Sequence, residues 1–298
     1  CFFKQKTAYE IHERLVGSEM CIRDRINAVY QGNFDSLDNI QVSPLSRAYT
    51  FSDSIYEVIP FFRGVAIGYN EHLARLQRSA HAIDIDVDQS LVSKEVSQLI
   101  ESCDYENGYV YYQVSRGVDQ IRNHIYNNNI EIEYFGYVKN HGFEDQKFKV
   151  LVCDDIRWGR CDIKSTSLLA NTMMMNQAHQ KGCNEIIMHK FGYITEAGAS
   201  NIFFIYKDKV CTPKLNNNIL PGITRSMSID IFKKNGIGVI EDDFSIDILS
   251  QASKIWLTSS TKGMAEIYDI DNLKHCISNE NALFKKCKLA FNKSFFNL

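Results

Sequence analysis

The feature that most constrains the fold is an alternation of strand-like and helix-like segments that one polar run interrupts. Four segments of the first half are rich in β-branched and aromatic side chains, which is typical of strands: 26–32, 55–62, 109–115 and 131–138. The run KNHGFEDQK at 139–147 has no period, and a new strand-like segment follows it. We therefore expect an N-terminal α+β domain at 26–140, a linker at 141–147 and a C-terminal domain at 148–298.

Helical spacing appears between these strands. In 70–83 the apolar residues lie three and four positions apart and predict one buried stripe, formed by Leu73, Leu76, Ala80 and Ile83. Asn70 is expected to cap this helix, and 91–103 predicts a second one. The second half predicts helices near 166–182, 222–234 and from about 280, with strands at 148–155, 185–189, 193–197, 201–206 and 254–260.

Composition narrows the choice of partners. A chain of 298 residues with 45% hydrophobic content is long enough for two cores. Its net charge of -3 is spread without basic runs, so we expect neither nucleic-acid nor membrane partners, and no apolar run approaches the ~20 residues of a membrane span. The nine cysteines form no C-x-x-C pair, so we expect reduced thiols in a cytoplasmic protein that acts on small molecules.

Residues 1–25 need separate treatment. They contain no apolar signal-peptide core and resemble translated sequencing-adapter read-through. We expect a non-native leader here, with a genuine N-terminal extension as the alternative.

Common nucleotide and metal motifs are absent from the sequence. It contains no G-x-x-x-x-G-K-[ST], G-x-G-x-x-G, H-E-x-x-H or G-x-S-x-G, and its histidines and cysteines do not pair at metal-ligand spacings. We therefore expect no metal site. What remains is a potential anion site, where Pro221 and Gly222 precede a helix that carries Thr224 in its first turn. A simple turn explains these residues equally well, as a polar strand end explains the hydroxyls of LTSST at 257–261.

Seven segments taken together resemble the fold-type IV, or class IV, pyridoxal-phosphate (PLP) transaminases, and most closely the D-amino-acid type. They occur in family order: SRAYTFSDSIYEV (46–58), NEHLARLQRSA (70–80), YYQVSRGVDQIRNH (111–124), DIRWGRCDIKS (155–165), YITEAGASNIFF (193–204), NNNILPGITR (216–225) and LTSST (257–261). The resemblance covers residues from about 26 to 270. It implies a two-domain α+β and α/β fold with the cofactor between the domains, and an enzyme that transfers an amino group from a D-amino acid to a 2-oxoacid.

The resemblance assigns the central chemistry to two residues. Lys164 matches the lysine that forms the Schiff base with PLP and moves the substrate proton. Glu196 matches the carboxylate that faces the pyridine nitrogen and keeps the ring an electron sink. Without the family pattern, Glu196 would be interpreted as an exposed turn residue.

The phosphate and the substrate each need their own group. Arg75 matches the phosphate arginine, with Arg78 as a solvated neighbour. The remaining expected cofactor contacts are Leu220, Ile223, Thr224, Ser259 and Ser260.

The residues matching the trap for the substrate carboxylate are Tyr56, Arg122 and His124. In the family the arginine and histidine come from the partner subunit, which implies a homodimer. Arg116 competes for the same carboxylate. The segment RGVDQIRNH is one residue longer than the family's R-G-x-x-P-R-x-H pattern and lacks its proline, and the turn after Glu196 reads AGASN.

Four alternative functions stay open. Three belong to the same fold: a branched-chain aminotransferase, an aminodeoxychorismate lyase and an (R)-amine transaminase. The arginine and histidine beside Tyr56 argue against the first two. A non-catalytic PLP-binding protein is the fourth, although simple binding needs neither Lys164 nor Glu196.

Overall fold

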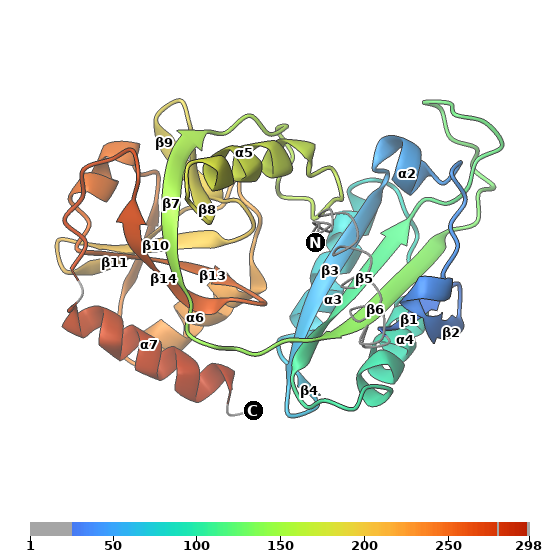
Figure 1. Ribbon diagram of the computed structural model, residues 1–298, viewed down its shortest axis with the longest axis horizontal. Helices are drawn as coiled ribbons and strands as arrows, with labels where there is room; N and C mark the ends of the chain where they lie inside the picture. The colour runs from blue at the N-terminus through green and yellow to red at the C-terminus, as the bar shows by residue number, and fades with distance from the viewer. Residues whose placement is uncertain (1–25, 279, 297–298) are drawn as a thin grey trace, which may run out of the picture.

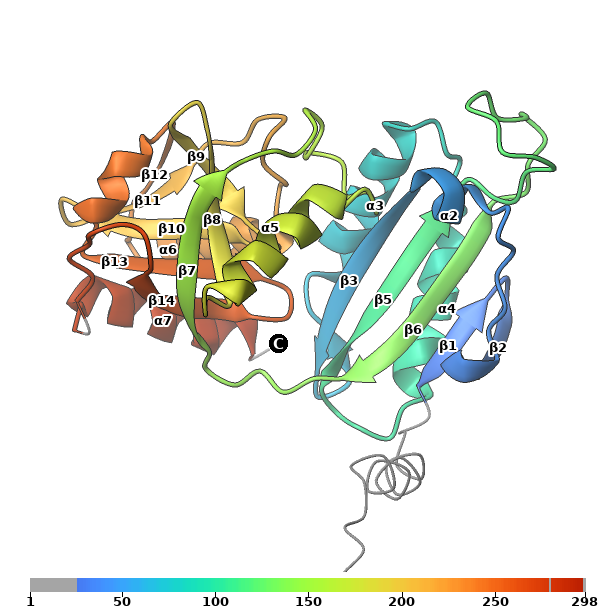
Figure 2. The ribbon, with the colours of Figure 1, turned by 45° about the horizontal axis from the view of Figure 1, so that its top comes forward.

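The computed structural model describes residues 26–278 and 280–296, so the expected leader at 1–25 lies outside the described residues. The chain builds two β-sheets, one from each half of the sequence, and Figure 1 shows them as two lobes. β6 ends at Asn140 and β7 begins at Lys147, and Figure 2 shows the segment between them running from one lobe to the other. Among the described residues, no helix combines the length and apolar character that a membrane span needs.

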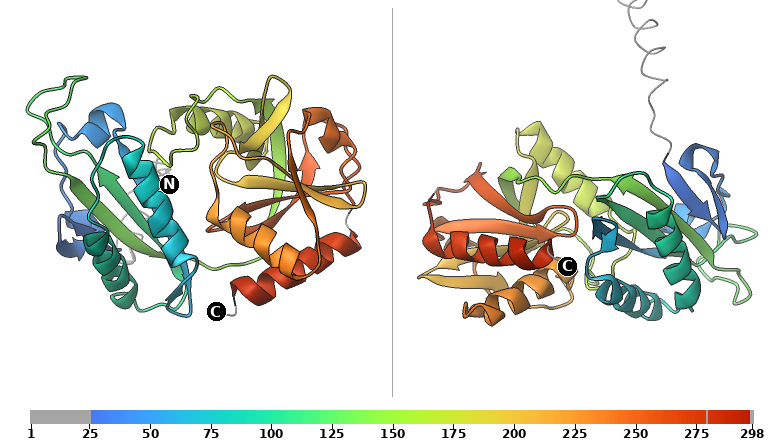
Figure 3. Two further views of the ribbon diagram at one scale, coloured as in Figure 1. Left: turned by 180° about the vertical axis from the view of Figure 1, so that it is seen from behind. Right: turned by 90° about the horizontal axis from the view of Figure 1, so that it is seen from below.

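The first sheet has six strands, and each neighbouring pair is antiparallel. Its order across the sheet is β2 (Asn33–Ser36), β1 (Asn27–Tyr30), β6 (Glu133–Asn140), β5 (Gly108–Ser115), β3 (Ser54–Phe62) and β4 (Val65–Ala66). Helices α3 (Tyr69–His81) and α4 (Gln89–Glu101) cover one face, as Figure 3 shows from behind. The short elements η1 (Leu37–Asn39) and α2 (Arg47–Phe51) precede β3.

Side chains of β3 alternate between the two faces of this sheet. Ile55, Ile59 and Phe61 are buried in the core that the sheet forms with α3 and α4. Tyr56 and Val58, at the intervening positions, line a cavity on the other face. This period of two lets one strand serve both the core and the cavity.

The second sheet has eight strands and mixed directions. Its order is β12 (Val239–Asp242), β11 (Lys209–Pro213), β10 (Asn201–Tyr206), β13 (Lys254–Ser259), β14 (Gly263–Ile270), β7 (Lys147–Asp154), β8 (Glu185–Lys190) and β9 (Tyr193–Ala197). Parallel β7 and β8 are joined through α5 (Leu169–Gln180), which packs on both strands. Helices α6 (Ile223–Lys234) and α7 (Ala282–Phe295) lie side by side against this sheet, and η2 (Ile246–Ser250) precedes β13.

The structure confirms the expected helices and strands and corrects several details. Asn70 does not cap α3: it is the second residue of the helix, and the N-cap is Gly68, which adopts a left-handed φ of 63°. Glycine suits this position because a Cβ there would lie 2.9 Å from Ile223 Cγ2 at the start of α6. The sequence did not predict β2, β4, β11, β12 and β14, and the helix expected from 166 begins at Leu169.

Candidate active site

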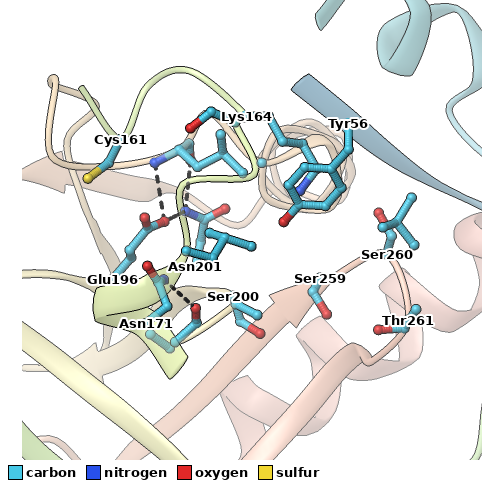
Figure 4. Close-up of a pocket in the computed structure, with 18 of the residues that line it drawn as sticks. Tyr56, Cys161, Lys164, Asn171, Glu196, Ser200, Asn201, Ser259, Ser260 and Thr261 are labelled. Atoms are coloured by element: carbon cyan, nitrogen blue, oxygen red, sulfur yellow. Dashed lines mark hydrogen bonds between the residues drawn. The ribbon is translucent and has the colours of Figure 1, made fainter. Parts of the chain in front are cut away.

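A cavity of about 520 Å³ lies between the two sheets. Nine of the residues proposed for cofactor and substrate line it, although they come from both halves of the sequence: Tyr56, Arg75, Lys164, Glu196, Leu220, Ile223, Thr224, Ser259 and Ser260. Figure 4 shows Tyr56 beside the Lys164 side chain on one side and Glu196 with Asn201 on the other.

The backbone of Lys164 is pinned to the first sheet. Lys164 lies between β7 and α5, and the Tyr56 N–H donates to its carbonyl at 3.0 Å. Its own N–H donates to the Ser79 hydroxyl of α3 at 3.2 Å, and the Thr166 N–H donates to the Ser54 carbonyl at 3.1 Å. The chain around Lys164 therefore pairs with the first residues of β3, which fixes the lysine at the boundary between the two lobes.

The Lys164 amine has no carboxylate partner among the described residues. Its Nζ lies 4.1 Å from the centroid of the Tyr56 ring. The other basic residues that line the cavity are paired: Arg75 with Glu57, Arg157 with Asp155 and Glu196, and Lys262 with Glu185. An amine without a salt bridge stays available to a carbonyl group that enters the cavity.

Glu196 stands near the end of β9 and is held by three donors. One carboxylate oxygen accepts from Arg157 Nη1 at 2.5 Å, and the other accepts from Asn201 Nδ2 at 3.0 Å and from the Leu220 N–H at 3.2 Å. Burial raises the pKa of Glu196 to about 7, against the opposing effects of Arg157 and the Leu220 N–H. Because burial disfavours the ionised form of Glu196, a cationic group in the cavity would stabilise that form.

Arg157 is itself oriented by a second carboxylate. Its Nε and Nη2 donate to Asp155 at 2.9 and 2.7 Å, and Asp155 also accepts from the Thr195 hydroxyl at 2.9 Å. Burial opposes the charge of Arg157, but Asp155 and Glu196 more than offset it and raise the arginine pKa. Arg157 is therefore a fixed cation beside Glu196.

Arg75 projects from α3 and is locked by Glu57 of β3. Its Nε and Nη2 donate to the two Glu57 oxygens at 2.8 and 2.7 Å, and Nη1 donates to the Pro221 carbonyl at 3.1 Å. His72 Nδ1 lies 2.7 Å from the same carboxylate. Burial alone would raise the pKa of Glu57, but Arg75 and His72 bring it well below its usual range. A guanidinium has five N–H donors, so three bonds leave two for a ligand.

The start of α6 forms another part of the cavity wall. Gly222 is the N-cap and provides no side-chain cap, so the first-turn N–H groups at Ile223 and Thr224 need other acceptors. A Cβ at Gly222 would lie 1.9 Å from Asn201 Oδ1, so the backbone approaches this wall too closely for a side chain. Thr258 also lines the cavity, and its buried hydroxyl has no hydrogen-bond partner among the described residues. These groups fit an anionic ligand.

Arg122 and His124 do not reach the cavity of their own chain. Both are exposed on the loop after β5, where Arg122 Cζ lies 4.5 Å from the Phe51 ring centroid and the His124 ring lies 5.2 Å from it. Figure 1 shows this loop beyond α2, at the outer corner of the first lobe. The structure therefore brings Tyr56 to the cavity without its two expected companions.

The two alternative arginines have other surroundings. Arg116 is buried and donates to Asp53 at 2.7 Å and to the carbonyls of Ile83 and Asp84 at 2.5 and 3.1 Å, and it does not line the cavity. Arg78 is exposed on α3. Arg116 is therefore occupied by structural contacts.

Sequence reasoning missed Arg157, Asn201, Glu57 and His72. Arg157 lies 39 residues from Glu196, and His72 lies 15 residues from Glu57, so no local spacing marks these pairs. Asn201 is only five residues from Glu196, but an asparagine in a strand carries no signal of its own. The sequence held one weak signal for Arg157, because this arginine lies two residues after Asp155, where the predicted strand at 148–155 ends.

Comparisons with known proteins identify the family. Residues 54–270 match the model of the amino-transferase class IV family. The chain belongs to the class IV aminotransferases. Among its relatives is a D-alanine aminotransferase of Listeria monocytogenes, 37% identical over 238 residues that cover 76% of this chain and 82% of the relative. A D-alanine aminotransferase of Staphylococcus aureus is 32% identical over 250 residues, covering 80% and 87%.

Solved structures agree on the fold. The branched-chain aminotransferase of Thermoproteus uzoniensis superimposes with a TM-score of 0.82 and 20% identity, covering 92% of this chain and 95% of that one. The class IV aminotransferase therefore has the two-domain fold-type IV architecture and uses PLP. Three features of the described residues fit that cofactor. They are the Thr258 hydroxyl without a hydrogen-bond partner, the glycine at 222, where a side chain would not fit, and the Lys164 amine without a carboxylate partner.

Proposed function

We propose that this enzyme transfers the amino group of a D-amino acid of the D-alanine type to a 2-oxoacid. The observation that carries the proposal is the pairing of a lysine amine without a salt bridge and a buried carboxylate in one cavity, Lys164 and Glu196. The choice of a D-substrate rests on the relatives, which are D-alanine aminotransferases at 37% and 32% identity. The likeness to a branched-chain enzyme, at 20% identity, extends to the fold alone.

In this proposal Lys164 attaches the cofactor and then moves the substrate proton. When bound, PLP supplies an electrophilic carbonyl and an electron-withdrawing ring. The Lys164 backbone, fixed to β3 and α3, holds the amine on one side of the cavity, so it delivers and removes the proton from that side. Tyr56 packs against the amine and limits where it swings.

Glu196 stabilises the protonated ring nitrogen. Its donors Arg157 and Asn201 fix both carboxylate oxygens, so the charge is aimed before any ligand enters. Leu220, whose N–H donates to the same carboxylate, lines the cavity and would pack against the ring.

The remaining wall binds the phosphate. Arg75 offers its two free N–H donors, and the α6 start offers the N–H groups of Ile223 and Thr224. The hydroxyls of Ser259 and Ser260 add neutral donors. The start of α6 also places the positive end of a helix dipole toward the anion.

Arg122 and His124 bind the substrate carboxylate in the cavity of a partner subunit, which makes a homodimer necessary for activity. The support is that these residues are exposed and remote from their own cavity, while Tyr56 lines it. Cytoplasmic location stays a prediction from the sequence. The free thiols among the described cysteines support it.

Spectral half-reactions test the proposed activity. The purified enzyme should carry a near-visible absorbance band, and borohydride should fix the cofactor covalently to wild-type protein but not to Lys164→Ala. D-Alanine should convert this band, whereas L-leucine should not. Conversion of the band by L-leucine alone would overturn the proposed D-amino-acid specificity. A protein that binds no PLP would overturn the proposed activity.

Mixing inactive variants tests the shared site. If Arg122 serves the partner's cavity, a mixed dimer of Lys164→Ala and Arg122→Met chains contains one intact site, and random mixing restores about a quarter of wild-type activity. Glu196→Gln with Lys164→Ala is the matched control, because both residues belong to the same chain's cavity. That mixture should stay inactive. If Arg122 instead acted within its own chain, neither mixture would recover.

A further inference from the structure

The turn between β13 and β14 is held by a residue of the interdomain segment, His141. Ser259 pairs with Gly263, so the loop consists of Ser260, Thr261 and Lys262. Gly263, the residue that follows this loop, adopts a left-handed φ of 57°, which glycine does at little cost. The His141 ring Nε2 lies 2.6 Å from the Thr261 carbonyl oxygen. A carbonyl only accepts, so Nε2 carries the proton and donates it.

His141 is itself fixed on the first lobe. The centroid of its ring lies 5.8 Å from that of Tyr109 of β5 and 5.2 Å from that of Phe143, both in edge-on geometry. The backbone N–H of His141 donates to the Asn107 carbonyl at 3.3 Å. Tyr109 and Thr261 both line the cavity. The imidazole therefore joins a wall of the first lobe to a wall of the second.

The hydrogen bond continues through one peptide unit to Ser259. In a trans peptide the carbonyl and the following N–H point in opposite directions, so the Thr261 carbonyl and the Lys262 N–H are two ends of one plate. His141 holds the first end, and the Lys262 N–H donates to the Ser259 Oγ at 3.2 Å. Because a hydroxyl has one proton, an Oγ that accepts from Lys262 keeps that proton for a different acceptor.

We infer that His141 is a positioning residue that aims the Ser259 hydroxyl proton into the cavity, toward the phosphate of the cofactor. The inference rests on the proposed function, in which Ser259 is a phosphate donor. Figure 4 shows Ser259, Ser260 and Thr261 along one edge of the cavity, where such a donor has access to a ligand. Loss of His141 would free the peptide plate to rotate and would leave the hydroxyl without a fixed direction.

Binding of two cofactor analogues tests this inference. PLP and pyridoxal differ only in the phosphate, so a defect in phosphate positioning weakens the binding of PLP and leaves the binding of pyridoxal unchanged. His141→Phe keeps the ring packing and removes the donor. We expect its dissociation constant for PLP to rise about five- to tenfold, because the hydrogen bond from Ser259 to the phosphate is misdirected rather than removed, with no change for pyridoxal. Absorbance titration of cofactor-free protein measures both constants.

Variants of matched chemistry separate positioning from simple stapling of the lobes. His141→Gln carries an amide nitrogen near the position of Nε2 and should bind PLP as the wild type does, whereas the shorter His141→Asn should not. Asp145→Asn loosens the same interdomain segment at its pair with Lys288, 2.7 Å long, and should leave the preference for PLP over pyridoxal unchanged. The Gln and Asn pair decides the question even if His141→Phe folds poorly.

A double-mutant cycle with Ser259→Ala identifies the route. If His141 acts through Ser259, the double variant loses no more PLP affinity than Ser259→Ala alone. Additive losses, or equal weakening of PLP and pyridoxal by His141→Phe, would overturn the inference while leaving the proposed function intact. A wild-type protein that binds neither compound would overturn the proposed function first, and the inference with it.

Discussion

The buried carboxylate of Glu196 should make the stability of the PLP-free enzyme depend on pH. Burial raises its pKa from 4.5 to about 7, so the folded protein holds the proton more tightly than the unfolded chain does. Stability should therefore fall as the pH rises. Below about pH 4.5 the carboxyl is protonated in both states and burial costs nothing through ionisation. As the pH rises to about 7, the unfolded chain gains charge that the folded state resists, and stability falls.

The size of this loss follows from the same two values. Raising a carboxyl pKa from 4.5 to about 7 is equivalent to about 3 kcal/mol of unfolding free energy, at about 1.4 kcal/mol per pKa unit. Glu196→Gln removes the ionisation. We therefore expect the unfolding free energy of the variant, relative to that of wild type, to rise by about 2 to 3 kcal/mol from pH 5 to pH 8.

Urea unfolding of the PLP-free proteins at these two pH values measures the effect, with the fluorescence of buried Trp256 reporting on the same domain. Glu71→Gln, the same substitution at an exposed position of α3, is the control, and its unfolding free energy should differ from that of wild type by the same amount at both pH values. If Glu196→Gln differed from wild type by the same amount at pH 5 and pH 8, the argument from burial would be refuted.

Three further substitutions test the packing of the site and its support. Gly222→Ala forces a Cβ against Asn201, and we expect about tenfold weaker PLP binding in an absorbance titration. Arg75→Lys cannot keep the forked pair with its carboxylate partner and should weaken PLP by a similar factor of about ten, measured in the same way. Tyr112→Phe removes the hydroxyl that bonds buried Glu95, whose other oxygen has no partner among the described residues, and should cost about 1 to 3 kcal/mol in urea unfolding.

The sequence predicted elements where periodicity was strong and missed those where it was weak. The stripe from Leu73 to Ala80 found α3, because a helix packed on one side must repeat its apolar residues. β14 escaped notice because glycine opens it and acidic residues interrupt its apolar pattern at Glu266 and Asp269. Its neighbours in the sheet, β13 and β7, stabilise it through pairing that no local pattern records.

The site divides in the same way. The family pattern marks Lys164 and Glu196, and the structure brings both to one cavity although they are not adjacent in sequence. Asn201 and Arg157 could not be predicted from the sequence, because their importance comes from hydrogen bonds to Glu196 that only the folded chain creates. The N-cap of α3 was misassigned for a related reason: Gly68 is needed by contact with Ile223, a residue of the other lobe.

The charges of the cavity explain why one lysine differs from the other cations. Arg75, Arg157 and Lys262 are each held by a carboxylate, so they serve as fixed donors whose positions a ligand does not have to organise. Lys164 is held by its backbone instead, and its side chain contacts an aromatic ring. In the proposed function Lys164 forms a bond, releases it and then moves a proton, and a salt bridge to its amine would have to break at every step. The same folding that pairs three cations with carboxylates leaves the Lys164 amine, alone among the described basic residues of the cavity, without a carboxylate partner.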